Sequence, residues 1–166
     1  MSSAPPRLAI YVDGANLDIA SEAAGIHIDY VRLRAFLGGN REIVLANYYN
    51  SKSTDPGERA FYKRVETAGF MLTLGPTKRP NQPQKETDVQ IAVDMISGTY
   101  CNSFDIALLV SGDGDLAPAV RKMLSMNKLV EVASFDDPAR KEFSWSLKSI
   151  ASRTIDLTKD MSRFKK

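Results

Sequence analysis

Two aspartates stand one glycine apart where an apolar run gives way to a helical pattern. In the segment LLVSGDGDLAPAV, residues 108–120, these are Asp113 and Asp115. Asp13 follows an earlier apolar run in the same way, and Asp88 stands where another helical pattern starts. Carboxylates packed closely together repel one another and raise one another's pKa. A divalent cation in the gap would relieve that repulsion, and an all-oxygen ligand set favours Mg²⁺ or Mn²⁺.

A metal held by carboxylates polarises a phosphoryl oxygen and activates water, so phosphodiester hydrolysis is the chemistry that this pattern predicts, with one or two ions. The predicted catalytic and metal-binding residues are Asp13, Asp88, Asp113 and Asp115. Each also has a structural reading, as a helix cap or as part of a turn. We favour the metal interpretation because all four stand at strand ends or helix starts. Asp94 is expected to form a structural hydrogen bond instead.

Polar and cationic residues near the same segments could bind substrate. The predicted substrate-binding residues are Asn16, Lys52, Lys78, Arg79, Lys85 and Ser111. For Asn16 a turn or cap amide is an open alternative, for Ser111 an ordinary strand-end serine, and for the cations a solvated surface. Cations that contact phosphates hold a nucleic acid without reading its sequence. Single-stranded RNA is the preferred substrate, since an exposed chain threads readily into a groove, and DNA is left open.

The elements that must position these residues alternate along the chain. Short apolar or β-branched runs predict strands at 7–12, 42–50, 70–74, 104–112, 128–135 and 154–157. Helical spacing predicts helices at 28–38, 55–69, 87–100, 116–124 and 142–152. This alternation predicts an α/β fold, a three-layer α/β/α sandwich with a mainly parallel central sheet. Sites in such sheets lie beyond the carboxyl ends of the strands, near the switch in strand order. If the first and fourth strands are neighbours, the four aspartates converge there.

Several local expectations can be checked against the structure. The pattern Thr87-x-x-Gln90 predicts a capping box that starts a helix at Thr87, after a polar loop at 75–86. Helical spacing predicts two buried faces, formed by Val31, Leu33, Phe36 and Leu37, and by Val89, Ala92, Val93, Ile96 and Tyr100. At most one of Tyr48 and Tyr49 is expected to face the site. His27 is expected to be a surface or packing residue.

Composition sets limits on the remaining function classes. The single cysteine and the single histidine exclude a disulfide framework, a Cys-based metal site and a His-rich zinc site. The net charge of +2 is too small to indicate a nucleic-acid partner by itself. No apolar run is long enough to cross a membrane and the start does not resemble a signal peptide, so a cytoplasmic protein with no membrane partner is expected. We expect a disordered leader at 1–6, one domain at 7–157 and a frayed basic tail at 158–166. A homodimer is left open.

Taken together, three segments resemble the NYN domain family, specifically its LabA-like bacterial branch, which is grouped with the PIN-like and FLAP-type nucleases. They are IYVDGANL, KETDVQIAVDM and LLVSGDGDLAPAV, and the closing SLKSIASRTIDL fits the same pattern. The resemblance implies a PIN-like fold and metal-dependent ribonuclease activity over residues 7–157. It places Asp13, Asp88, Asp113 and Asp115 on the acidic positions of the family, Asn16 on its asparagine and Lys85 on its lysine.

Three positions depart from the family pattern. Glu86 replaces a small residue and adds negative charge near the phosphate path, which bears on substrate preference. Ser152 and Thr154 replace acidic and aromatic residues of the closing motif.

Other functions remain alternatives. A non-catalytic RNA-binding or regulatory module on the same fold would bind RNA without cleaving it. A phosphatase or phosphotransferase that uses Asp113-Gly114-Asp115 as its D-x-D motif is weaker, because that motif normally follows the first strand. A dinucleotide enzyme is weaker still, because no G-x-G-x-x-G follows the first strand.

Overall fold

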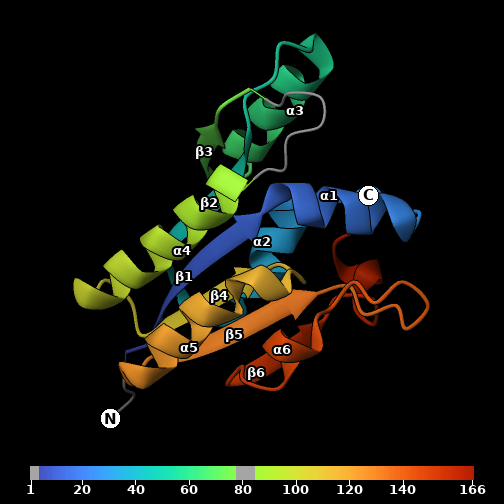
Figure 1. Ribbon diagram of the computed structural model, residues 1–166. Coiled ribbons are helices and arrows are strands. Elements are labelled where there is room, and N and C mark those ends of the chain that lie inside the picture. Colours follow the sequence, from blue (N-terminus) through green and yellow to red (C-terminus); the bar gives the residue numbers. More distant parts are fainter. Residues whose placement is uncertain (1–3, 78–84) are drawn as a thin grey trace.

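The computed structural model describes residues 4–77 and 85–166. Its elements, in chain order, are β1 Arg7–Asp13, α1 Gly14–Ala23, α2 Tyr30–Gly38, β2 Glu42–Ser51, α3 Pro56–Thr67, β3 Met71–Gly75, α4 Lys85–Tyr100, β4 Ile106–Val110, the 3-10 helix η1 Gly114–Leu116, α5 Ala117–Ser125, β5 Leu129–Ser134, α6 Trp145–Lys148, β6 Arg153–Asp156 and the 3-10 helix η2 Met161–Arg163. Figure 1 shows their arrangement.

The strands form one sheet in the order β3-β2-β1-β4-β5-β6, and every neighbouring pair is parallel. The chain builds the sheet outward from β1 to β3 and then returns to the centre to build outward from β4 to β6. The strand order therefore switches between β1 and β4, so the condition under which the sequence analysis expects the aspartates to converge is met. In a parallel sheet of this kind, side chains just past the ends of those two strands share one crevice.

Alternate residues of the central strands contribute to two hydrophobic layers, one on each face of the sheet. One layer holds Leu8 and Ile10 with side chains of α1, α2 and α3. The other holds Ala9 and Tyr11 with side chains of α4, α5 and α6. The predicted α/β/α sandwich is thus confirmed, and β4 is buried on both faces, which explains its uninterrupted apolar sequence.

Helix α3 begins as its sequence predicts. The Asp55 carboxylate accepts a hydrogen bond from the Glu58 backbone N–H at 2.9 Å, and Pro56 occupies the first turn. Two other helices differ from the prediction. A helix, α1, occupies residues 14–23, where the sequence analysis predicts no helix. Helix α6 covers just residues 145–148 of the predicted 142–152.

The start and the buried face of α4 also differ from the prediction. The helix begins at Lys85, two residues before the predicted capping box. Its buried side chains include Ile91 and Met95, whereas Val89, Val93 and Tyr100 are 61%, 50% and 68% exposed. The predicted Ala92 and Ile96 do pack against the core, so the buried face is shifted toward Ile91 and Met95 and overlaps the predicted one. In α2 the predicted Leu33 and Leu37 are buried, whereas Val31 is exposed.

The segment after β6 is packed rather than frayed, contrary to expectation. Phe164 is fully buried, and its carbonyl accepts a hydrogen bond from the Asp29 backbone N–H at 2.8 Å. At the other end, residues 4–6 have exposed side chains, and the rest of the predicted leader lies outside the described residues. Within the described ranges, no helix has both the length and the apolar character needed to cross a membrane.

Candidate acidic site at the strand switch

The site begins where β1 and β4 end side by side. Val12 pairs with Val110, so Asp13 and Ser111 leave neighbouring strands at the same edge of the sheet. Both residues are buried. The Ser111 hydroxyl donates a hydrogen bond to Asp13 Oδ2 at 2.9 Å, and the Asn16 backbone N–H donates to Asp13 Oδ1 at 3.1 Å. Asp13 therefore both ends β1 and caps α1, which fixes its carboxylate in place.

The same network reaches the second pair of aspartates. The Asp113 backbone N–H donates to the Ser111 hydroxyl at 3.1 Å, and the Gly112 backbone N–H donates to the Asn16 side-chain oxygen at 2.9 Å. Asp113 in turn caps η1, because its Oδ1 accepts a hydrogen bond from the Asp115 backbone N–H at 2.9 Å. Ser111 and Asn16 thus connect Asp13 to the S-G-D-G-D loop.

Asp88 approaches this network from the first turn of α4. Partial burial raises its pKa to about 6, and the negative charges of Asp13, Asp113 and Asp115 contribute to the rise. Burial also raises the pKa of Asp13; the charge of Asp113 adds to this effect, while the hydrogen bonds from Asn16 and Ser111 oppose it. All four predicted carboxylates therefore share one electrostatic environment.

The donor chemistry of this cluster fits Mg²⁺ or Mn²⁺, which prefer oxygen ligands. A dication would also relieve the repulsion that raises the pKa of Asp88. Among the described residues, however, no three His, Cys, Asp or Glu side chains lie close enough together to hold one ion. The cluster is thus an open arrangement of carboxylates, and coordination by three of them would require side-chain movement.

The predicted substrate-binding residues have different surroundings. Asn16 and Ser111 use their side chains in the network itself. Lys52 is exposed just past the end of β2, the strand next to β1, and Lys85 opens α4. Lys78 and Arg79 lie outside the described residues.

Four residues outside the acidic cluster have the surroundings expected of them. The Asp94 carboxylate accepts a hydrogen bond from the Tyr49 hydroxyl at 2.8 Å and another from the Gln90 side chain at 2.7 Å. His27 is exposed. Tyr48 and Tyr49 are both fully buried, which agrees with the expectation that at most one of them faces the site.

Asp18 is an interior acid that the sequence analysis missed. Its carboxylate accepts hydrogen bonds from the Tyr48 hydroxyl at 2.8 Å and the Tyr30 hydroxyl at 3.0 Å. Burial raises its pKa, and these two hydrogen bonds oppose that rise. Asp18 therefore anchors α1 to β2 and α2, and so supports the helix that Asp13 caps. Its position five residues after Asp13 was the available signal, but the helix between them was not predicted.

The segment before α6 also packs on residues 111–115, which we call the acidic loop. No sequence pattern predicts this contact. The Ser144 backbone N–H donates to the Gly112 carbonyl at 3.0 Å. A Cβ atom at position 112 would lie 1.8 Å from the Glu142 carbonyl oxygen, so only glycine fits there. A Cβ at position 114 would lie 2.7 Å from the Ser144 hydroxyl. The glycines around Asp113 therefore let this segment approach closely.

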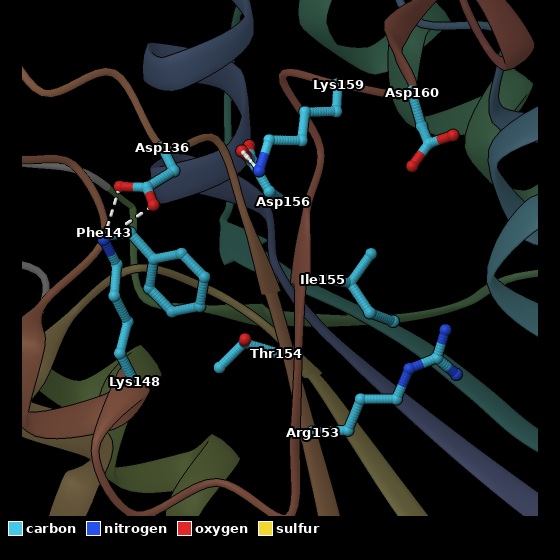
Figure 2. A pocket seen from close by; sticks show the side chains of 9 residues that line it. All are labelled: Asp136, Phe143, Lys148, Arg153, Thr154, Ile155, Asp156, Lys159 and Asp160. Atoms are coloured by element: carbon cyan, nitrogen blue, oxygen red, sulfur yellow. Dashed lines mark hydrogen bonds and ion pairs between the residues drawn. The ribbon is translucent and has the colours of Figure 1, made fainter.

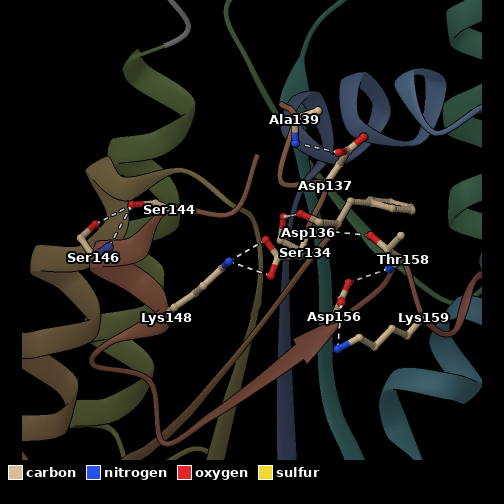
Figure 3. Close-up of polar contacts among 11 residues, drawn as sticks. Ser134, Asp136, Asp137, Ala139, Ser144, Ser146, Lys148, Asp156, Thr158 and Lys159 are labelled. Atoms are coloured by element: carbon tan, nitrogen blue, oxygen red, sulfur yellow. Dashed lines mark hydrogen bonds and ion pairs between the residues drawn. The ribbon is translucent and has the colours of Figure 1, made fainter. Parts of the chain in front are cut away.

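A pocket of about 340 Å³ opens along β6, as Figure 2 shows. Its three cations all have carboxylate partners: Lys148 pairs with Asp136 at 2.5 Å, Lys159 with Asp156 at 3.4 Å, and Arg153 with Glu131 at 3.7 Å. Figure 3 shows Lys148 reaching across to Asp136 from α6. Because these positive charges are already paired, the pocket is poorly suited to bind phosphate.

Comparisons with known proteins agree with this fold. A family model described as "NYN domain" matches residues 7–158. The low amplitude and bright protein LabA of Synechococcus elongatus is 27% identical over 95% of this chain and 87% of its own length. An uncharacterized protein of Methanocaldococcus jannaschii is 28% identical over 91% of this chain, which spans 55% of that protein. A crystal structure of a protein of unknown function from Vibrio parahaemolyticus matches with a TM-score of 0.84 at 28% identity, covering 100% of this chain and 99% of that one.

Proposed function

The chain belongs to the NYN domain family, a PIN-like nuclease family, and on that premise we propose that it is a metal-dependent ribonuclease. It hydrolyses phosphodiester bonds of RNA, with single-stranded RNA preferred and DNA as a second substrate to be tested. The observation that carries the proposal is that Asp13, Asp113 and Asp115 lie at or just past the ends of β1 and β4 at the strand switch and that the charges of all three act on Asp88.

Asp13, Asp88, Asp113 and Asp115 would hold Mg²⁺ or Mn²⁺, which when bound activates water and neutralises charge on the scissile phosphate. The protein contributes positioning. Ser111 and the cap of α1 hold the buried Asp13 carboxylate in one orientation. Asn16 holds the loop at Gly112, so that Asp113 keeps its place relative to Asp13. Lys52 and Lys85 are proposed to contact the RNA backbone.

The test is cleavage of a labelled single-stranded RNA in Mg²⁺, in Mn²⁺ and in chelator. We expect cleavage only with metal, and we expect Asp113→Asn to reduce the rate at least about 100-fold, a loss typical for groups that stabilise charge in the transition state. His27→Ala is the matched control, because the only histidine is exposed and has no role in the proposed site. Cleavage by Asp113→Asn at the rate of the unmodified protein would overturn the assignment.

One observation favours a second candidate, a non-catalytic RNA-binding or regulatory module. The carboxylates, as they stand in the described residues, do not form a closed set of metal ligands. This candidate predicts RNA binding that is insensitive to metal, with no cleavage. A crystal soaked in Mn²⁺ separates the two: anomalous density for one or two ions among the four carboxylates supports the nuclease, and an empty cluster supports the binding module.

A further inference from the structure

The chain contains one tryptophan, and it lies on the surface. Trp145 is 78% exposed, the highest value among the exposed large hydrophobic residues of the described chain. Isolated exposed hydrophobic residues are common, so exposure alone carries no function. The position of Trp145 relative to the acidic loop gives it significance.

The residues on both sides of Trp145 contact the acidic loop. Ser144 donates its backbone N–H to the Gly112 carbonyl at 3.0 Å. Figure 3 shows the Ser144 and Ser146 side chains pointing toward each other. Their hydroxyls lie 2.7 Å apart, and a Cβ at Gly114 would come within 2.9 Å of both. Helix α6 also packs against η1, the turn that carries Asp115. The backbone of Trp145 is therefore held next to the loop that carries Asp113 and Asp115, and its indole is exposed from that position.

The surroundings of Trp145 favour a nucleobase over a protein as the occupant. Its neighbours in the chain are serines, and residues 130–166, all of which the structure describes, contain no other exposed large hydrophobic residue. A docking surface for a protein is normally a contiguous apolar patch. A single exposed aromatic ring beside a polar site is instead the arrangement on which unpaired bases stack.

The charges near Trp145 also favour a nucleobase as the occupant. The cation nearest along α6, Lys148, lies one turn after Trp145 and is paired with Asp136 at 2.5 Å. The aspartates beside Trp145 repel phosphates. Binding at this place therefore needs a contribution that does not depend on positive charge, and stacking on the indole provides one.

We propose that Trp145 is a substrate-positioning residue that stacks against a base of single-stranded RNA next to the acidic site. This inference rests on the proposed function for its substrate class. It adds a preference for unpaired bases, because a base inside a duplex has no free face to offer the indole.

The test uses the fluorescence of Trp145, which as the only tryptophan reports on this position alone. The Asp113→Asn variant is titrated with an eight-nucleotide oligoadenylate, so that binding is measured without turnover. We expect saturable quenching with oligoadenylate. We expect none with an abasic oligomer of the same length and charge, because that oligomer has no base to stack. Equal quenching by the abasic oligomer would overturn the inference.

Affinity is then compared by anisotropy of the labelled oligoadenylate, again in the Asp113→Asn background. Adding Trp145→Ala should weaken binding about 10-fold to 100-fold, the loss expected for one stacked base, and adding Trp145→Phe should weaken it less. Tyr100→Ala is the matched control, because Tyr100 is another exposed aromatic residue, on α4, and should leave affinity unchanged. Unchanged affinity in the Trp145→Ala protein would overturn the inference.

The outcomes also separate this inference from the proposed nuclease. If the unmodified protein cleaves RNA and Trp145→Ala cleaves and binds equally well, the stacking inference fails and the nuclease stands. If the unmodified protein cleaves nothing but oligoadenylate quenches Trp145, the nuclease fails and stacking stands as part of an RNA-binding module. Because the indole is exposed, Trp145→Ala should keep the circular dichroism spectrum of the folded protein.

Discussion

At the residue scale, the charged forms of Asp13 and Asp88 are stabilised to different degrees by their surroundings. Asp13 is buried but receives hydrogen bonds from Ser111 and Asn16, which favour its charged form. Partial burial, and after it the charges of Asp13, Asp113 and Asp115, raise the pKa of Asp88 to about 6. Asp88 is therefore the position where the cost of holding a charged carboxylate in the cluster should be measurable as lost stability.

Replacing that carboxylate should stabilise the protein. An aspartate with a raised pKa in the folded state destabilises the fold as pH rises from its usual pKa near 4 to about 6, and by a constant amount above that. Asp88→Asn removes this penalty. We expect the free energy of unfolding to increase by about 1 kcal/mol at pH 7.5, after discounting the shift for solvent exposure, and to be unchanged below pH about 4.

Thermal unfolding in chelator at several pH values measures this effect. Asp115→Asn is the control, since Asp115 is exposed and its replacement should give a smaller gain. A gain in Asp88→Asn that is equally large at pH 4 and at pH 7.5 would contradict the explanation by charge. The same variant should lose RNA cleavage if Asp88 is a metal ligand, so stability and activity would change in opposite directions.

At the scale of elements, the sequence was informative where local pattern and topology agree. The apolar runs before Asp13 and Ser111 indicate strands, and the alternation with helices indicates a parallel sheet. The pairing of β1 with β4 is one order that such a sheet allows, and the structure shows that order. Helix α1 could not be predicted, because Asp13-Gly14 is equally typical of a turn. The pattern of α4 was ambiguous because two neighbouring rows are apolar, and only the packing of Ile91 and Met95 on the sheet decides between them.

Contacts between elements that are far apart in the sequence could not be predicted, because no local sequence pattern indicates them. The approach of residues 142–144 to Gly112 is one example, and the anchoring of α1 by Asp18 is another. Both depend on tertiary packing, which single-sequence patterns do not encode. The positions of the site's aspartates were therefore predictable, whereas the residues that hold the acidic loop in place were not.

Because the Glu142 backbone lies so close to Gly112, we expect position 112 not to tolerate any larger residue. A Cβ there would overlap the Glu142 backbone carbonyl, which cannot move without shifting the whole segment before α6. We expect Gly112→Ala to lower the free energy of unfolding by about 1–3 kcal/mol, the usual range for overpacking. Gly114→Ala is the matched comparison, because its closest neighbours are serine hydroxyls that can rotate away, and it should lower stability less. Urea denaturation of both variants measures the difference, and an equal loss would contradict this account.

At the scale of the whole molecule, the end of the chain returns to its first half. The Phe164 ring lies 5.5 Å from that of Phe36 in α2 and 6.4 Å from that of Phe135, measured between centroids. The Lys166 backbone N–H donates to the His27 carbonyl at 2.9 Å. The basic residues of this segment predict a frayed tail, but the segment also contains one fully buried aromatic side chain, Phe164.

Phe164 should accordingly contribute to global stability. We expect Phe164→Ala to lower the free energy of unfolding by about 3–5 kcal/mol, as for other buried phenylalanines. Lys166→Ala removes an exposed side chain from the same segment and should change stability by less than about 0.5 kcal/mol. Urea unfolding of the two proteins tests the pair. A loss below about 1 kcal/mol in Phe164→Ala would mean that the segment does not stabilise the fold.

The pairing of β1 with β4 has a consequence for protein synthesis. Asp13 leaves the ribosome early, but its partner strand spans Ile106–Val110 and the two remaining acids follow at 113 and 115. Until β4 has been translated, β1 lacks one of its two neighbours and the nascent polypeptide carries an incomplete cluster. A ribonuclease assembled in this order would have no complete active site before residue 115 has been synthesised.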